Sequence, residues 1–240
     1  DALTAFPGDA FRPSRAVTLG EFARAAAAAF GVTLPAGRPA ESAAVEALIE
    51  RGVLPRSERL YESIDLPISV GNVMSAAVRL AGMDDVSRSW PAEDPVAASM
   101  ALARAAGIMP ASVEPEDASR PATRAEAVQV LYQARRHSTL SGKLERKGAS
   151  TAEIETELGS VRVRLDDGAV VVRNGRPASV DELVDGDKVA AVVDVTGRAR
   201  VVAASGSGLA LDFDSSRLVA TAQRVLQEIA QQLTPEQWQM

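Results

Sequence analysis

Arg124 is the side chain of this 240-residue chain that is best suited to contact a ligand. A guanidinium group binds carboxylates through paired, charge-assisted hydrogen bonds. Arg124 stands at the predicted start of a helix, where its positive charge opposes the helix dipole, so another interaction is expected to compensate. Two interpretations are open: contact with an anionic ligand, with Arg120 and Trp90 in the same groove, or an ion pair with an acid such as Glu126 or Asp117.

Other residue types that support chemistry are scarce. The chain has no cysteine and a single histidine, His137, which excludes a nucleophilic triad. Carboxylates occur in short runs on predicted connectors and turns: Asp84–Asp85, Glu114–Asp117, Asp166–Asp167 and Asp185–Asp187. Solvated turns are favoured over catalysis, and a loose Ca²⁺ site among these loops is left open. The chain is therefore predicted to be non-enzymatic and to carry no other cofactor.

The segment around Arg124 is one of three related segments that start predicted helices. A hydroxyl residue recurs after 51 and then 54 residues, and an acid or amide follows it by three places: Thr18 with Glu21, Ser69 with Asn72, and Thr123 with Glu126. This spacing is typical of a helix N-terminal cap, because the hydroxyl accepts from a backbone amide of the first turn. Repeats of about this length indicate units that pack against copies of themselves.

The three segments resemble the S-layer homology (SLH) domain family. Phe11-Arg12-Pro13 leads into the first segment, and the opening helices of the next two repeats end in Gly52-Val53 and Gly107-Ile108. Asp85-Val86 and Trp90 open the third repeat in the manner of the family. The resemblance covers roughly residues 5–136. It implies a helical repeat module on a secreted, extracellular cell-surface protein.

The resemblance also implies a partner, an anionic cell-wall polysaccharide, bound by Arg124 and Glu126 with Arg120 and Trp90 beside them. Leu19 and Val70 stand where the other two repeats would carry the arginine, so only the third repeat keeps this ligand-type residue. Repeat one is also predicted to lack its opening helix, because few residues precede Phe11-Arg12-Pro13. These departures favour a surface protein that uses the module partly for self-assembly.

Residues 138–204 change from a helical to a strand period. Val161, Val163 and Leu165 alternate with arginines, which indicates a half-buried strand. Asn174-Gly175 is a strong turn signal. Six short strands are predicted, and their number in so short a stretch favours a small antiparallel barrel. The region resembles the small barrel modules found downstream of SLH repeats, on the phrase from Val172 to Val189.

Residues 205–240 are predicted to form a flexible joint followed by an amphipathic docking helix from Arg217 to Leu233. The apolar stripe of this helix contains four candidate assembly residues: Leu218, Val225, Leu226 and Ile229. A helix beyond a joint needs a surface to cover, and exchange between neighbours would build a homo-oligomer or a polymer.

The fold class predicted from these patterns is α+β and multi-domain. An all-α SLH-like module occupies residues 1–137 (repeats 1–33, 34–83 and 84–137), the six-stranded antiparallel β-barrel residues 138–204, and the joint with its helix residues 205–240. The net charge of −6 argues against nucleic acid as a partner, because a phosphate backbone requires a basic surface. No apolar run is long enough for a membrane span. The alternative function is a structural subunit of an S-layer-like sheet, tube or filament without glycan binding.

Overall fold

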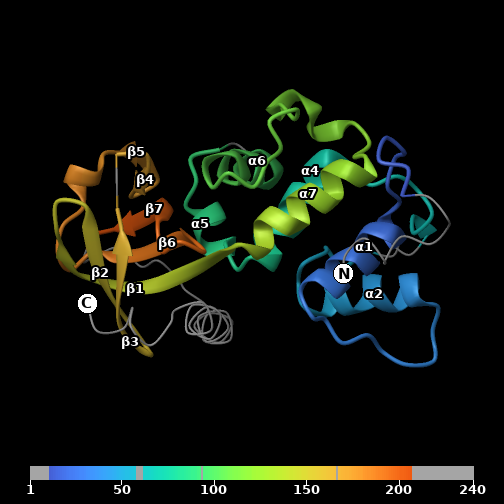
Figure 1. Cartoon of the computed structure of the whole chain (residues 1–240), viewed down its shortest axis with the longest axis horizontal. Helices are drawn as coiled ribbons and strands as arrows, with labels where there is room; N and C mark the ends of the chain where they lie inside the picture. The colour runs from blue at the N-terminus through green and yellow to red at the C-terminus, as the bar shows by residue number, and fades with distance from the viewer. Residues whose placement is uncertain (1–10, 58–61, 93, 166, 207–240) are drawn as a thin grey trace. The chain divides into compact units, whose positions relative to one another are not determined.

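The computed structural model describes residues 11–57, 62–92, 94–165 and 167–206, and the chain divides into two compact units. The first unit comprises residues 1–80 and 92–135, and the second comprises residues 81–91 and 136–240 (Figure 1). The described helices of the first unit are α1 (Leu19–Ala29), α2 (Ala40–Glu50), α4 (Val70–Leu80), α6 (Pro95–Ala105), the short 3-10 helix η2 (Pro115–Ser119) and α7 (Arg124–Arg135). Helix α2 packs against α1, while both α6 and α7 pack against α4.

The caps predicted from the repeats are confirmed. Thr18 accepts a hydrogen bond from the amide of Glu21 (3.2 Å), and the Glu21 carboxylate accepts one from the amide of Thr18 (3.3 Å). In the third repeat, Thr123 and Glu126 make the same reciprocal pair, at 3.2 and 2.8 Å. In the second, Ser69 accepts from the amide of Asn72 (3.3 Å). These bonds satisfy amides that a helix start leaves without an intrahelical partner, so α1, α4 and α7 each begin directly after the hydroxyl residue.

The residues just before these three helices close a ring of backbone hydrogen bonds. The Val17 amide donates to the Ala122 carbonyl (2.9 Å), the Ala122 amide to the Ile68 carbonyl (2.9 Å), and the Ile68 amide to the Val17 carbonyl (3.1 Å). All three residues are buried. A second set of amide-to-carbonyl bonds links the same three segments in the opposite direction around the ring: Leu19 to Leu66 (3.0 Å), Val70 to Arg120 (2.9 Å) and Arg124 to Arg15 (2.9 Å). The repeats are thus related cyclically, and each contacts both others at equivalent positions.

Two of the three helices carry a glycine where another helix crosses them. A Cβ atom on Gly71 would lie 2.6 Å from Cγ1 of Val96 in α6 and 3.0 Å from the Ala118 carbonyl oxygen. A Cβ atom on Gly20 would lie 3.0 Å from Cβ of Glu41 in α2. The equivalent residue of α7 is Ala125, which is exposed. The glycines therefore permit the close approach of α2 to α1 and of α6 to α4.

We expect Gly71→Ala to lower the free energy of unfolding by about 1–3 kcal/mol through overpacking against α6. The direction of this change in stability is informative, because alanine is otherwise more favourable than glycine in a helix by about 1 kcal/mol. Ala125→Ser, at the equivalent exposed position of α7, is the matched control and should change stability by no more than about 0.5 kcal/mol. Urea denaturation followed by circular dichroism measures both, and a stabilised Gly71→Ala variant would contradict the close crossing.

The second unit contains a seven-stranded sheet and one short helix among its described residues. Helix α5 (Asp84–Arg88) packs against strand β6. The strands follow the order β3-β2-β1-β6-β7-β4-β5. They are β1 (His137–Lys147), β2 (Thr151–Thr156), β3 (Gly159–Arg164), β4 (Val170–Arg173), β5 (Arg176–Ala178), β6 (Lys188–Asp194) and β7 (Ala199–Ser205), with a 3-10 turn η3 (Val180–Glu182) before β6. The core of the sheet is aliphatic, and its largest fully buried side chains are Leu144, Ile154 and Leu165.

The prediction of a six-stranded antiparallel barrel is wrong. The described sheet has a seventh strand, β5, which returns from the Asn174-Gly175 turn along β4, and β4 pairs with β7 in parallel. An isolated bridge between Arg164 and Arg198 ties the end of β3 to the turn before β7, but the described strands form no ladder from β3 to β5. The sheet is therefore mixed and open. Strand β5 has three residues, and Pro177 in it cannot donate a ladder hydrogen bond, so it is suited to an edge.

Candidate functional site

Arg124, the leading candidate for ligand contact, is buried at the junction of the first and third repeats. Its side chain is 1% exposed, and its Nε donates to Oε2 of Glu21 (3.3 Å) while Nη2 forms an ion pair with Oε1 of the same carboxylate. Nη1 donates to the Phe11 carbonyl (3.1 Å). Arg15 also contacts Glu21 (3.6 Å), from a half-exposed position. The guanidinium therefore binds a carboxylate of its own chain in bidentate geometry, as in the ion-pair interpretation, although the acid is neither Glu126 nor Asp117.

The electrostatics of Glu21 show that this pair is held together in the charged state. Burial alone would raise the pKa of Glu21, but the hydrogen bonds from Arg124 and from the amide of Thr18, together with the charges of Arg124 and Arg15, outweigh it. The pKa of Glu21 consequently lies below its ordinary value of 4.5. A carboxylate with a depressed pKa stabilises the fold above its unfolded pKa, and this contribution is lost as the pH falls through the folded value.

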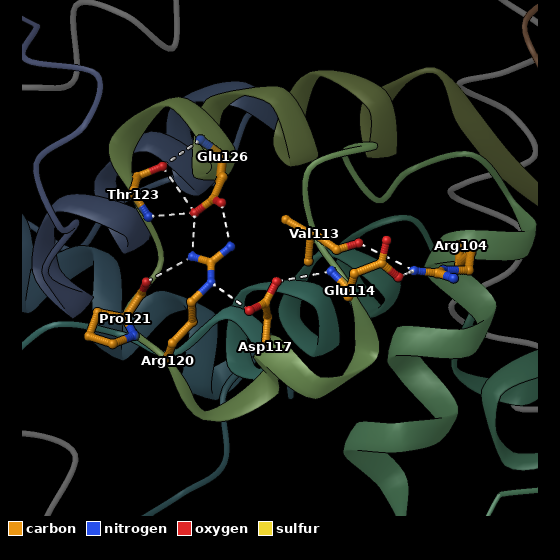
Figure 2. A network of polar contacts seen from close by, with 8 residues as sticks. All are labelled: Arg104, Val113, Glu114, Asp117, Arg120, Pro121, Thr123 and Glu126. Atoms are coloured by element: carbon orange, nitrogen blue, oxygen red, sulfur yellow. Dashed lines mark hydrogen bonds and ion pairs between the residues drawn. The ribbon is translucent and has the colours of Figure 1, made fainter.

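Arg120 and Glu126 come together in a separate network on the outside of the third repeat (Figure 2). Arg120 donates to both oxygens of Glu126 (3.0 and 2.6 Å) and pairs with Asp117 (3.1 Å). Glu114 links this network to Arg104, because its amide donates to Asp117 (3.0 Å) and its carboxylate accepts from Arg104. The side chain of Arg120 is 34% exposed, which makes it the more accessible of the two candidate arginines.

The pKa values of Glu126, Asp117 and Arg120 are each shifted in the direction that favours the charged form. The hydrogen bond from Arg120 is the main cause that holds the pKa of Glu126 below its ordinary value. The pKa of Asp117 is lowered first by the backbone amide of Glu114 and then by Arg120. The hydrogen bonds to Glu126 and then Asp117 raise the pKa of Arg120. An external carboxylate would therefore have to replace one of two internal acids to bind Arg120 through both nitrogens.

The ion-pair partners expected from the sequence were assigned to the wrong arginine. Glu126 and Asp117 pair with Arg120, whereas Arg124 pairs with Glu21, which lies 103 residues away in the chain. The sequence reasoning did not single out Glu21 as a partner. A signal was present, because repeat one keeps an acid at the position where repeat two has Asn72, and only repeat three has the arginine.

Trp90 belongs to the second unit, and the candidate assembly residues are not among the described residues. Trp90 is half-buried in the second unit, just after α5, and its amide donates to the Ser87 carbonyl (3.2 Å). Leu218, Val225, Leu226 and Ile229 lie outside the described residues. Within the first unit, the structure thus joins Arg120 to Glu126 and places Arg124 on a different acid.

One of the acidic runs that left a Ca²⁺ site open, Asp185–Asp187, is hydrogen-bonded to other residues of the second unit. Asp187 accepts two hydrogen bonds from the Arg173 guanidinium (3.0 Å each), and Asp185 accepts from the amide of Lys147 (2.8 Å). Burial would raise the pKa of Asp187, but the Arg173 hydrogen bond and the Val184 amide lower it below its ordinary value. In the described ranges, no group of three or more His, Asp or Glu side chains is arranged to hold a metal ion.

None of the described helices has the length and apolarity that crossing a membrane requires. In comparisons with known proteins, no family model and no curated protein matches the chain. The resemblance to the SLH family therefore depends on the residues of the three repeats alone.

Proposed function

We propose that this chain is a non-enzymatic, secreted cell-surface protein whose helical module serves self-assembly or attachment to cell-wall glycan. The observation that supports this most is the cyclic ring formed by Val17, Ile68 and Ala122, because it joins three degenerate repeats into one module.

Self-assembly has the stronger support of the two roles. The arginine that the SLH resemblance assigns to glycan is buried against Glu21, so it braces two repeats. Exposing Arg124 to a ligand would leave the buried Glu21 without its main partner, which is costly. The face of α7 around Ala125 is exposed, whereas the equivalent faces of α1 and α4 are covered by α2 and α6. An uncovered position in a cyclic module is suited to contact with another segment or another copy.

Glycan attachment is retained as a second candidate because of Arg120. Its guanidinium is one-third exposed and already arranged for two-nitrogen contact with carboxylates. An anionic saccharide could compete for it with Asp117, which is itself partly exposed. Arg120 would then replace Arg124 as the ligand-contacting arginine.

Electron microscopy and co-sedimentation of the full chain test the two roles together. We expect ordered assemblies in the purified protein without added wall material. If glycan attachment also operates, purified cell-wall sacculi should pellet the protein, and Arg120→Ala should reduce the pelleted fraction while Arg104→Ala leaves it unchanged. Protein that remains monomeric at every concentration and does not pellet with sacculi would refute the proposed function.

A further inference from the structure

The sheet of the second unit is buried on both of its faces. Successive side chains of a strand point to opposite faces, and one face carries the aliphatic core, with Ala191, Val202 and Ala204 among its members. The residues that alternate with them in β6 and β7 are buried equally well: Ala190 is 0% exposed and Ala203 is 1% exposed. Strands that read as continuous apolar runs in this way are typical of sheets covered on both sides.

We call the side opposite the aliphatic core the second face. The register places its members side by side, because Thr139 pairs with Val192, Val192 with Val201, and Ala203 with both Ala190 and Val172. Each of these six residues is at most 2% exposed. All six side chains are small or β-branched, so the second face is an even surface of the kind on which a helix packs.

The second face is too large for the short helix that the structure describes in this unit. Helix α5 packs against β6 and has five residues, so it is about 7.5 Å long. The second face crosses four neighbouring strands, β1, β6, β7 and β4, which span about 14 Å at the usual strand spacing. Strand β7 has seven residues and is about 23 Å long. Burial of the whole second face therefore needs a further and longer element.

The chain that follows β7 contains a segment of matching length and pattern. Outside the described residues, 217–233 carries apolar residues at helical spacing: Leu218, Val219, Ala222, Val225, Leu226, Ile229 and Leu233. As a helix this segment would be about 25 Å long, close to the length of β7. Its other side carries Arg224, Gln227 and Glu228, which would remain in water. One apolar stripe with a polar back is the pattern of a helix that covers a surface.

The connection to β7 favours the segment of the same chain over that of a second copy. The Gly206 amide donates to Oδ1 of Asn174 (3.2 Å), so the described chain ends beside the end of β4, next to the second face. Residues 207–216 reach about 33 Å when extended, which is enough to turn back over the sheet. A short linker of this kind gives an effective concentration in the millimolar range, so at micromolar protein the chain's own segment is favoured.

We propose that residues 217–233 lie as a helix on the second face of the sheet of their own chain. The inference goes beyond the proposed function and does not depend on it. It assigns the apolar stripe to the interior of the second unit and leaves assembly or glycan attachment to other surfaces.

Thiol reactivity tests the cover, because the chain contains no cysteine of its own. In the full-length protein, Ala203→Cys places a thiol on the second face, where it should react slowly with a maleimide. Adding Leu226→Asp puts a charge into the apolar stripe and should speed this reaction about tenfold or more, because the helix is released. Adding Gln227→Asp instead, on the polar side of the segment, should leave the rate unchanged.

Ala204→Cys is the matched control, because it is the next residue of the same strand and points into the aliphatic core. Its reaction rate should not respond to Leu226→Asp. Circular dichroism reports whether each variant keeps its secondary structure. An Ala203→Cys thiol that stays slow in folded Leu226→Asp protein overturns the inference, and so does equal acceleration of the Ala204→Cys thiol.

Photochemical cross-linking tests the contact without adding a charge. Leu226 is replaced by the photoreactive residue p-benzoylphenylalanine in the full-length protein, and the linked peptides are mapped by mass spectrometry after irradiation. We expect links to β6 or β7 in protein that remains monomeric on a denaturing gel, and no such links when Gln227 is replaced instead. Links to the first unit, links between two copies, or equal links from both positions overturn the inference.

Discussion

Arg124→Ala is expected to lower the free energy of unfolding by about 3–5 kcal/mol, because it leaves the buried carboxylate of Glu21 without its main partner. The loss also removes the hydrogen bond to the Phe11 carbonyl, which ties the start of the described chain to the third repeat. Urea denaturation at neutral pH measures the effect. A loss of this size would mean that the fold depends more on Arg124 than on any other residue of the segment that starts α7.

Two further variants show whether the cost arises from the unpaired charge. Arg15→Ala removes a half-exposed arginine from the same acid and should cost no more than about 1 kcal/mol. Replacing both Arg124 and Glu21 by leucine should recover most of the stability lost in Arg124→Ala, because apolar residues can replace a buried ion pair at little cost. A loss in Arg124→Ala no larger than that in Arg15→Ala would contradict the buried bidentate pair.

The buried pair also changes how a binding experiment must be interpreted. If Arg124→Ala abolished attachment to cell-wall sacculi, the cause could be loss of the fold, since Arg124 braces repeats one and three. Arg120 is the better probe, because its partners are partly exposed and its removal leaves no fully buried charge behind. The site that a glycan contacts is thus tested without disturbing the core.

Gly142→Ala is expected to destabilise the second unit by about 3 kcal/mol through a clash that side-chain movement cannot relieve. A Cβ atom on Gly142 would lie 2.0 Å from the carbonyl oxygen of Glu155, which is backbone. Gly142 lies where β1 passes from pairing with β6 to pairing with β2. A glycine at a strand bend permits such a close approach of two backbones.

Gly206→Ala is the matched control for Gly142→Ala. Its Cβ would lie 3.6 Å from the nearest atom, a nitrogen of Arg173, which is an ordinary contact. We expect the free energy of unfolding of that variant to stay within about 0.5 kcal/mol of the value for the parent protein. Equal stability of the two variants in the same denaturation experiment would show that the backbone of β2 does not lie so close to Gly142 of β1.

Local features of the structure could be predicted from the sequence because they depend on residues close together in the chain. The caps at Thr18, Ser69 and Thr123 join side chains to amides three residues away, and the helices start within one residue of the positions these caps predict. The alternation around Val161 and Val163 likewise predicted β3, since side chains in a strand point to opposite faces in turn.

The arrangement of the strands could not be predicted in the same way. Alternation shows that a segment is a strand, but it does not show which strand lies beside it or in which direction. In the sheet β7 lies between β6 and β4, antiparallel to β6 and parallel to β4, although β5, η3 and β6 separate β4 from β7 in the chain. The three residues of β5 around Pro177 were too few to give a period, so the seventh strand was missed.

By itself, the sequence determined where the helices of the repeats begin, that three repeats share one design, and that only the third repeat has an arginine directly after its capping hydroxyl. The tertiary structure decided that this arginine pairs with Glu21, that Arg120 takes Glu126 and Asp117, and that the sheet stays open. The physical reason is the range of the interactions. A cap is closed within one helical turn, whereas the Arg124 pair and the strand ladders join residues whose distance in the chain gives no sign of their contact in space.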